Sequence, residues 1–240
     1  VIQVLMRVYI RCKQFLMAYF EKDFIKFFKE LEKNNDRDWF KANKPRYEEV
    51  VKKPFELFVA DLIVNFAKQD KKLIVTPKEC IFRIYRDVRF SKNKQPYKLN
   101  VSAIICPKGR KGKDYPGMYV ELNHNHFRFY TGCYFPEKQA LTDIRYEIAA
   151  KPAEFRKLIS GKKFVDLFGE IRGEKNKILP KNLKEPASTE PLIFNKSFYS
   201  FHKEDPNVLL EDDLMKKCLD YYKIARPLND WLIRAGGYSE

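Results

Sequence analysis

The apolar positions near the start of the chain have the spacing of an amphipathic helix. Between residues 24 and 31 they follow the i, i+3, i+4, i+7 pattern, which places them on one helical face. Asn34–Asn35 indicates the end of this helix, and Asp36 is a suitable N-cap for a short helix that follows. Pro45 suits a first helical turn, whereas Pro54 is expected to kink or divide the longer apolar helix around it.

After residue 78 the pattern changes to the alternation that is typical of strands. β-branched and aromatic residues alternate with polar ones over residues 80–89, which predicts a strand. Val101–Cys106 predicts a second strand, and Gly117–Asn123 with His126–Gly132 predicts a hairpin closed by an Asn-containing turn. Phe198–His202 is a further candidate strand. Strands this close in sequence pair antiparallel, because a parallel crossover needs about a dozen residues.

Helical spacing returns in the second half of the chain. It predicts helices over residues 137–150 and 152–159, and a last helix from about Glu211, where acidic residues suit the helix dipole. The Pro- and Lys-rich stretch Gly169–Lys196 is expected to be irregular. We therefore expect an α+β fold with an antiparallel sheet of about four to six strands and helices from both chain ends packed on one face.

The organisation of the chain predicts a single α+β domain over residues 17–236, because no repeat or Ser/Gly-rich linker interrupts it. Residues 1–16 are interpreted as an upstream extension or tail, since Met17 is the simplest start and bases interrupt any signal-peptide core. No apolar run reaches the roughly 18 residues of a membrane span, so no membrane partner is expected. Five scattered cysteines without a CxxC pair indicate reduced thiols and a cytoplasmic location.

The net charge of +15 is concentrated in one segment. Residues 71–113 contain 13 Lys and Arg residues against only Glu79 and Asp87, for a local charge of +11. Such a field attracts anions, from phosphate backbones and anionic metabolites to acidic partners. A lysine-rich face that only aids solubility would have the same composition.

The predicted strand 80–89 carries the most informative pattern. Its odd positions include Arg83, Asp87 and Arg89, which would form an anion cradle with two guanidinium groups clamping oxygens and the carboxylate orienting one of them. Arg86 falls on the apolar face and needs a carboxylate or carbonyl partner there, which cannot be Asp87. The alternative is an outer sheet face with an exposed Arg–Asp–Arg ladder.

The loop after this strand supplies side chains that would close over the anion, namely Ser91, Lys92, Lys94, Tyr97 and Lys98. A second basic loop, Lys108–Lys113, contains two glycines that would let its backbone approach a phosphate, although hairpin tips often have this composition. The predicted ligand-binding residues are therefore Arg83, Arg86, Asp87, Arg89, Ser91, Lys92, Tyr97 and Lys98.

Motifs of common cofactor and catalytic sites are missing. The chain has no GxxxxGK[ST], GxGxxG, GxSxG or HExxH sequence, so no cofactor is expected. His124 and His126 would face the same way on a strand and, with His202, would hold a metal, but hairpin histidines usually face solvent and no metal is predicted. Cys133 is as well suited to the core as to a nucleophile, with no base nearby in sequence.

Several long stretches closely resemble signature segments of the family called domain of unknown function 2461. They are NNDRDWFKANKPRYEE (34–49), FRIYRDVRFSKNKQPYK (82–98), GMYVELN (117–123), FPEKQALTDIRYEI (135–148), RGEKNKILPKNL (172–183) and RPLNDWL (226–232). The resemblance runs in order over nearly the whole chain after Met17, and it departs at residues 127–135, where relatives are richer in glycine. It implies no reaction, cofactor or catalytic residue, and whether the protein is an enzyme stays open.

Three function classes remain. The leading one is binding of a phosphate-bearing ligand, either nucleic acid or a phosphorylated small molecule; nucleic acid predicts that the bases of 92–98 and 108–113 form one stripe. An enzyme acting on a small anionic substrate predicts a pocket where Arg83, Asp87 and Tyr97 converge. A protein-interaction module predicts an exposed apolar patch beside the basic segment.

Overall fold

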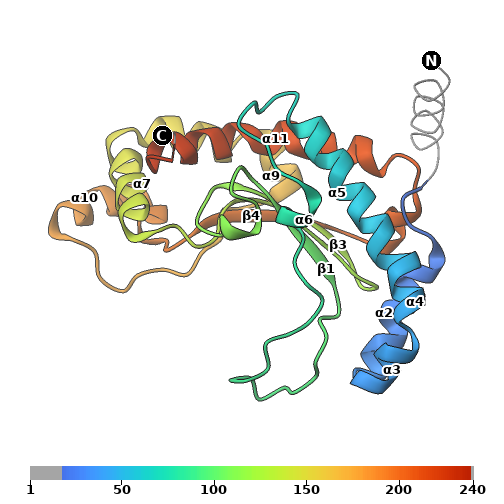
Figure 1. Cartoon of the computed structure of the whole chain (residues 1–240). Coiled ribbons are helices and arrows are strands. Elements are labelled where there is room, and N and C mark those ends of the chain that lie inside the picture. The colour runs from blue at the N-terminus through green and yellow to red at the C-terminus, as the bar shows by residue number, and fades with distance from the viewer. Residues whose placement is uncertain (1–17, 239–240) are drawn as a thin grey trace.

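A four-stranded antiparallel sheet is the centre of residues 18–238, the part of the chain that this computed structural model describes. The strands lie in sequence order: β1 (Val101–Ile105), β2 (Gly117–Leu122), β3 (Phe127–Cys133) and β4 (Phe198–Glu204). The predicted α+β class and antiparallel sheet are confirmed (Figure 1). The prediction for residues 1–16 lies outside the described residues.

The N-terminal helices follow the predicted boundaries closely. They are α2 (Lys22–Lys33), α3 (Arg37–Ala42), α4 (Lys44–Tyr47), the π-helical turn η1 (Glu48–Lys52) and α5 (Lys53–Phe66). Asp36 caps α3 as predicted, since its carboxylate accepts from the backbone N–H groups of Asp38 and Trp39, each at 2.9 Å. The apolar segment divides ahead of Pro54, which lies in the first turn of α5 and has no N–H to donate to the preceding turn.

Helices α5 and α11 (Leu214–Ala235) cover one face of the sheet (Figure 1). Every second strand residue points into this layer; Val120 and Phe129 are fully buried there. The ring of Phe129 meets Phe66 of α5 at 6.4 Å and Tyr221 of α11 at 5.7 Å, both edge-on. Helices from both ends of the chain therefore bury the same sheet face, as predicted.

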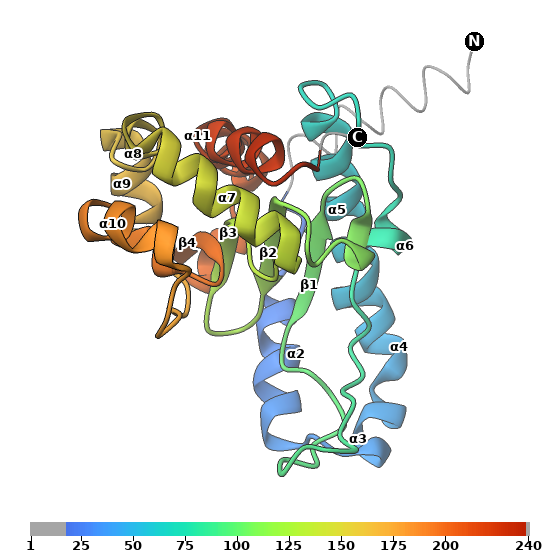
Figure 2. The same ribbon diagram turned by 90° about the vertical axis from the view of Figure 1, so that its left-hand side faces the viewer.

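Four helices lie between β3 and β4 in sequence and gather beside β4 (Figure 2). They are α7 (Lys138–Ala150), α8 (Pro152–Ile159), α9 (Lys162–Phe168) and α10 (Lys181–Thr189). The prediction that residues 169–196 are irregular is wrong for α10 and for the 3-10 turn η3 (Pro191–Phe194). Leu183 and Ala187, four residues apart, are both buried, and this pairing stabilises a helix despite the internal Pro186.

The predicted strand over residues 80–89 is not formed. The short helix α6 (Pro77–Cys80) is followed by a segment that leaves the sheet and projects below it as an irregular hairpin (Figures 1 and 2). We call residues 81–100 the basic hairpin; only the isolated pairs Ile81–Ala103 and Tyr85–Tyr97 have β geometry. The N–H of Arg86 donates to the Pro96 carbonyl, but Pro96 has no N–H to donate in return, so no continuous ladder forms.

Two further 3-10 turns complete the path of the chain. Turn η2 (Gly109–Lys111) lies in the connection between β1 and β2, and η4 (Pro206–Leu210) leads from β4 into α11. None of the helices within residues 18–238 has the length and apolar character needed to cross a lipid bilayer.

Candidate functional site

The two arginines predicted to form an anion cradle both act on the carboxylate of Asp87, Arg89 through direct contact and Arg83 through its charge. The guanidinium of Arg89 makes two hydrogen bonds to the Asp87 carboxylate, at 3.0 and 2.7 Å, and this contact lowers the pKa of Asp87. Arg83 is exposed on the same hairpin. The contact between Arg89 and Asp87 matches the ladder alternative better than the clamp, because the carboxylate that was to orient the anion already holds one of the two arginines.

Arg86 has the kind of partner that the sequence required. It is half-buried and donates to the carbonyl oxygen of Gln95 at 3.1 Å and to the Ser91 hydroxyl at 3.5 Å. Asp87 is not its partner, as expected. Arg86 and Ser91 therefore hold the end of the basic hairpin together.

Tyr97 is part of the core. Its ring stacks on Phe40 with centroids 4.0 Å apart and an interplanar angle of 16°. The Asn35 amide brackets its backbone, donating to the carbonyl and accepting from the N–H, each at 3.1 Å. Arg83, Asp87 and Tyr97 are not among the residues that line the cavity described next. Lys92 and Lys94 are exposed near the tip of the hairpin, whereas Lys98 lies at its base.

A cavity of about 550 Å³ lies on the sheet face opposite α5 and α11. This volume is in the range of small-molecule sites. Strand residues that point away from the helices form its floor, and loop residues form its rim; aromatic side chains predominate in the wall. The lining residues are Phe82, Lys98, Ser102, Ile104, Gly112, Lys113, Tyr115, Gly117, Met118, Tyr119, Glu121, Tyr130, Thr131, Gly132, Tyr134, Phe135, Tyr199 and Phe201.

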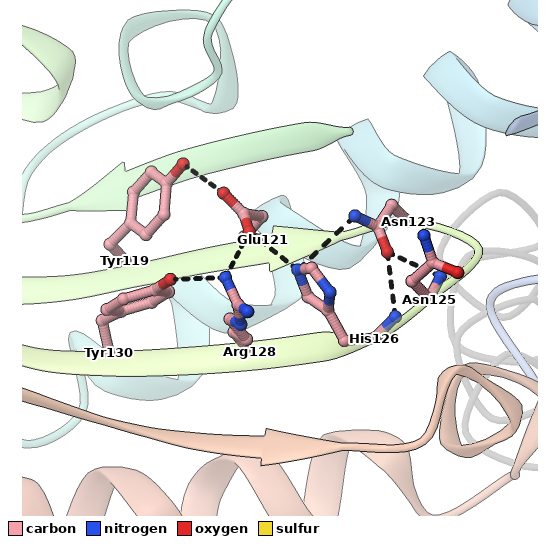
Figure 3. Close-up of polar contacts among 7 residues, drawn as sticks. All are labelled: Tyr119, Glu121, Asn123, Asn125, His126, Arg128 and Tyr130. Carbon is pink, nitrogen blue, oxygen red and sulfur yellow. Dashed lines mark hydrogen bonds and ion pairs between the residues drawn. The ribbon is translucent and has the colours of Figure 1, made fainter. Parts of the chain in front are cut away.

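Neighbouring residues of β2 and β3 form a polar cluster beside this floor (Figure 3). Glu121 is directly opposite Arg128 in the sheet register, and its carboxylate meets Arg128 at 3.4 Å and His126 Nε2 at 2.8 Å. The Tyr119 hydroxyl donates to the other carboxylate oxygen at 3.2 Å, and Arg128 also donates to the Tyr130 hydroxyl at 3.3 Å. Cross-strand pairing thus brings two tyrosines and one carboxylate to the cavity wall.

Burial dominates the protonation equilibria of this cluster. It lowers the pKa of His126, and this outweighs the opposing effect of the contact with Glu121. Burial also raises the pKa of Tyr119 and of Tyr130, so both phenols stay protonated at neutral pH and can donate hydrogen bonds.

Two lysines approach the rim of the cavity from different loops. Lys98 of the basic hairpin and Lys113 of the β1–β2 connection place their ammonium nitrogens 5.2 and 5.8 Å from the centre of the Phe82 ring. Within residues 18–238 neither ammonium has a hydrogen bond or an ion pair with a carboxylate. Burial and the charges of Arg83 and Lys113 lower the pKa of Lys98, so the rim is a partly desolvated positive site.

The three histidines have separate partners. His124 contacts Glu32 at 3.2 Å, His126 contacts Glu121, and Nδ1 of His202 meets the Leu167 carbonyl at 2.9 Å. The described part of the chain has no group of three or more His, Cys, Asp or Glu side chains that could hold a metal ion. Cys133 is buried, and burial raises its pKa to about 12, so it belongs to the core.

Of the two rim lysines, the sequence predicts Lys98 as a ligand-binding residue and places Lys113 only in the weaker second basic loop; it does not indicate the cavity floor. Tyr119, Glu121 and Tyr130 were overlooked, although their positions within the correctly predicted hairpin place them on one sheet face. The two predicted basic stretches approach each other at this rim through Lys98 and Lys113, whereas Lys92 and Lys94 do not line the cavity.

Comparison with known proteins identifies the family. The family model described as "Conserved hypothetical protein (DUF2461)" matches residues 23–231, and the chain belongs to this family, as its resemblance implied. No curated protein and no solved structure matches the chain.

Proposed function

We propose that this member of the DUF2461 family binds a small nucleotide-like ligand, in which a planar ring carries an anionic group, in the cavity on the sheet face. The observation that carries the proposal is the lysine pair at the rim of an aromatic cavity. Lys98 and Lys113 lack a carboxylate partner among the described residues, and Lys98 is half-buried. A phosphate between them would neutralise charge that burial leaves poorly solvated.

The wall chemistry suits the rest of such a ligand. Tyr130, Phe201 and Tyr199 offer aromatic surface. The Tyr130 hydroxyl keeps its proton to donate to a polar ring atom, and the Tyr119 hydroxyl, which donates to Glu121, can accept from one. We also propose a cytoplasmic setting, where phosphorylated metabolites are abundant, since the described cysteines are free thiols.

Binding fits the cavity better than catalysis. Glu121 is the only carboxylate among the lining residues, and both of its oxygens already accept hydrogen bonds from neighbouring side chains. A general base needs a free lone pair directed at its substrate. The contacts with Tyr119, His126 and Arg128 occupy most of the acceptor sites of this carboxylate, and an enzymatic role would have to use the one that remains on Oε2 beside Tyr119.

Calorimetric titration with adenosine 5′-monophosphate, adenosine and inorganic phosphate tests the proposal. We expect the monophosphate to bind more tightly than either part alone, and Lys98→Gln or Lys113→Gln to weaken its binding about tenfold each. Lys111→Gln is the matched control, because Lys111 lies in the same loop and does not line the cavity. Equal affinities for adenosine and its monophosphate, or equal effects of the three lysine variants, would refute the proposal.

A further inference from the structure

Phe90, at the tip of the basic hairpin, is the most exposed large apolar side chain of the described residues, with 96% of its surface accessible. It lies on the part of the chain that projects furthest from the sheet (Figures 1 and 2). It does not belong to the cavity described above. An aromatic ring held in solvent gains no burial free energy from the fold, so its position calls for another explanation.

Contacts within the protein hold the hairpin that carries this ring. Its stem is held by the stacking of Tyr97 on Phe40 and by the two hydrogen bonds from Asn35. Nearer the tip, the Lys94 ammonium donates to the Val88 carbonyl at 3.1 Å. The backbone around Phe90 is thus held by hydrogen bonds, so the fold itself keeps the ring exposed to solvent.

The surroundings of Phe90 are basic, and the other large exposed apolar side chain of the hairpin, Tyr85, lies at the stem against Tyr97. Residues 83–94 contain five Lys and Arg residues and one acid, Asp87. The Arg89 guanidinium lies 5.8 Å from the centre of the Phe90 ring, and Lys92 is exposed two residues further on. A protein partner that docks through apolar contact would need a wider apolar patch, and a lipid bilayer would need more than one inserted side chain.

From this arrangement we infer that the tip of the basic hairpin binds single-stranded nucleic acid. One base stacks on Phe90, and a flanking phosphate meets Lys92, which has no carboxylate partner among the described residues. Arg89, by contrast, is already paired with Asp87. Sequence-independent binding of single strands combines these two elements, an aromatic platform and a positive track for the backbone. The inference stands apart from the proposed cavity ligand, since Phe90, Arg89 and Lys92 do not line the cavity.

Fluorescence anisotropy of a labelled oligothymidylate of about 10 nucleotides, titrated with the full chain over a salt series, tests the inference. Phe90→Ala should weaken binding at least about fivefold and leave the salt dependence unchanged, because stacking involves no counterion release. Lys92→Ala should reduce the slope of log K against log salt by the contribution of about one phosphate contact. Neither change removes packing, since both side chains are exposed.

Two further variants separate stacking from other contacts. Ile178→Ala is the matched control: Ile178 is 80% exposed and also lies among lysines, and this variant should bind as the unmodified protein does. Phe90→Leu keeps an apolar side chain without a π face and should behave like Phe90→Ala. Unchanged binding in Phe90→Ala would overturn the inference, as would full binding by Phe90→Leu, or binding to anionic phospholipid vesicles but not to the oligonucleotide.

Discussion

The attachment of the basic hairpin depends on Asn35, and the change Asn35→Ala removes it without touching the hairpin itself. The Asn35 amide makes two hydrogen bonds to the backbone of Tyr97, both at 3.1 Å. At about 1 kcal/mol for each partly buried hydrogen bond, their loss weakens the stem by about 2 kcal/mol. This free energy corresponds to about a 30-fold larger population of the opened stem.

Amide hydrogen exchange measures this opening directly. The N–H of Arg86 donates to the Pro96 carbonyl and that of Lys98 to the Ile84 carbonyl, both at 2.8 Å across the stem. These two bonds remain in Asn35→Ala, so faster exchange at Arg86 and Lys98 reports opening rather than the deletion itself. We expect their protection factors to fall about 30-fold, with β2 amides unaffected.

The neighbouring Asn34→Ala is the control for this experiment. Asn34 makes its side-chain bond to the Glu30 carbonyl within the end of α2 and makes no contact with the hairpin, so exchange at Lys98 should not change. If Arg86 and Lys98 exchange at the original rate in Asn35→Ala, the stem is held by the stacking of Tyr97 on Phe40 alone, and the hydrogen-bond argument is wrong.

Two further predictions concern the cavity floor. Burial lowers the pKa of His126, which faces Glu121, Arg128 and Lys203. As the pH falls, the unfolded chain therefore binds this proton before the folded protein does, and the free energy of unfolding should decrease below about pH 6.5. In His126→Gln, the free energy of unfolding measured with guanidinium should depend less on pH in this range. Gly132 has φ +101°, and an added Cβ would lie 2.1 Å from the Phe198 carbonyl oxygen, so Gly132→Ala should cost about 3 kcal/mol in the same assay. At Gly169, where φ is +66° and ψ is −140°, an added Cβ would have no atom within 4 Å, so Gly169→Ala should cost only its backbone strain, about 2 kcal/mol; a loss as large as that of Gly132→Ala would contradict the steric argument.

Local sequence patterns predicted the helices and strands whose stabilising contacts lie within a few residues of one another in the sequence. The helix Pro152–Ile159 and the hairpin around Asn123–His126 follow from side-chain spacing and turn chemistry within a few residues. Residues 80–89 have the same strand composition, but the segment opposite them contains Pro96, which cannot return a hydrogen bond to Arg86. The outer edge of that segment is bonded to Asn35, which is distant in sequence. No pattern within residues 80–89 reveals either of these groups.

The candidate site could likewise be predicted from the sequence only in part. Charge clustering led to Lys98 and to the loop of Lys113, because charge is visible in composition alone. The floor formed by Tyr119, Glu121 and Tyr130 depends on which sheet face the helices leave uncovered, and this depends on the path of the whole chain. Alternation within a strand identifies two faces but does not tell which of them will be bare.

The order of the strands has a consequence for how the chain assembles during synthesis. Strands β1, β2 and β3 follow one another closely, but β4 pairs with β3 only after residues 134–197 have been made, and α11 follows later still. Closing so long a loop opposes this pairing, so we expect β4 to dock late. Until then the nascent chain carries β3 with an open edge, and Phe129 lacks the cover of Tyr221. The last forty or so residues therefore protect the unfinished sheet from self-association.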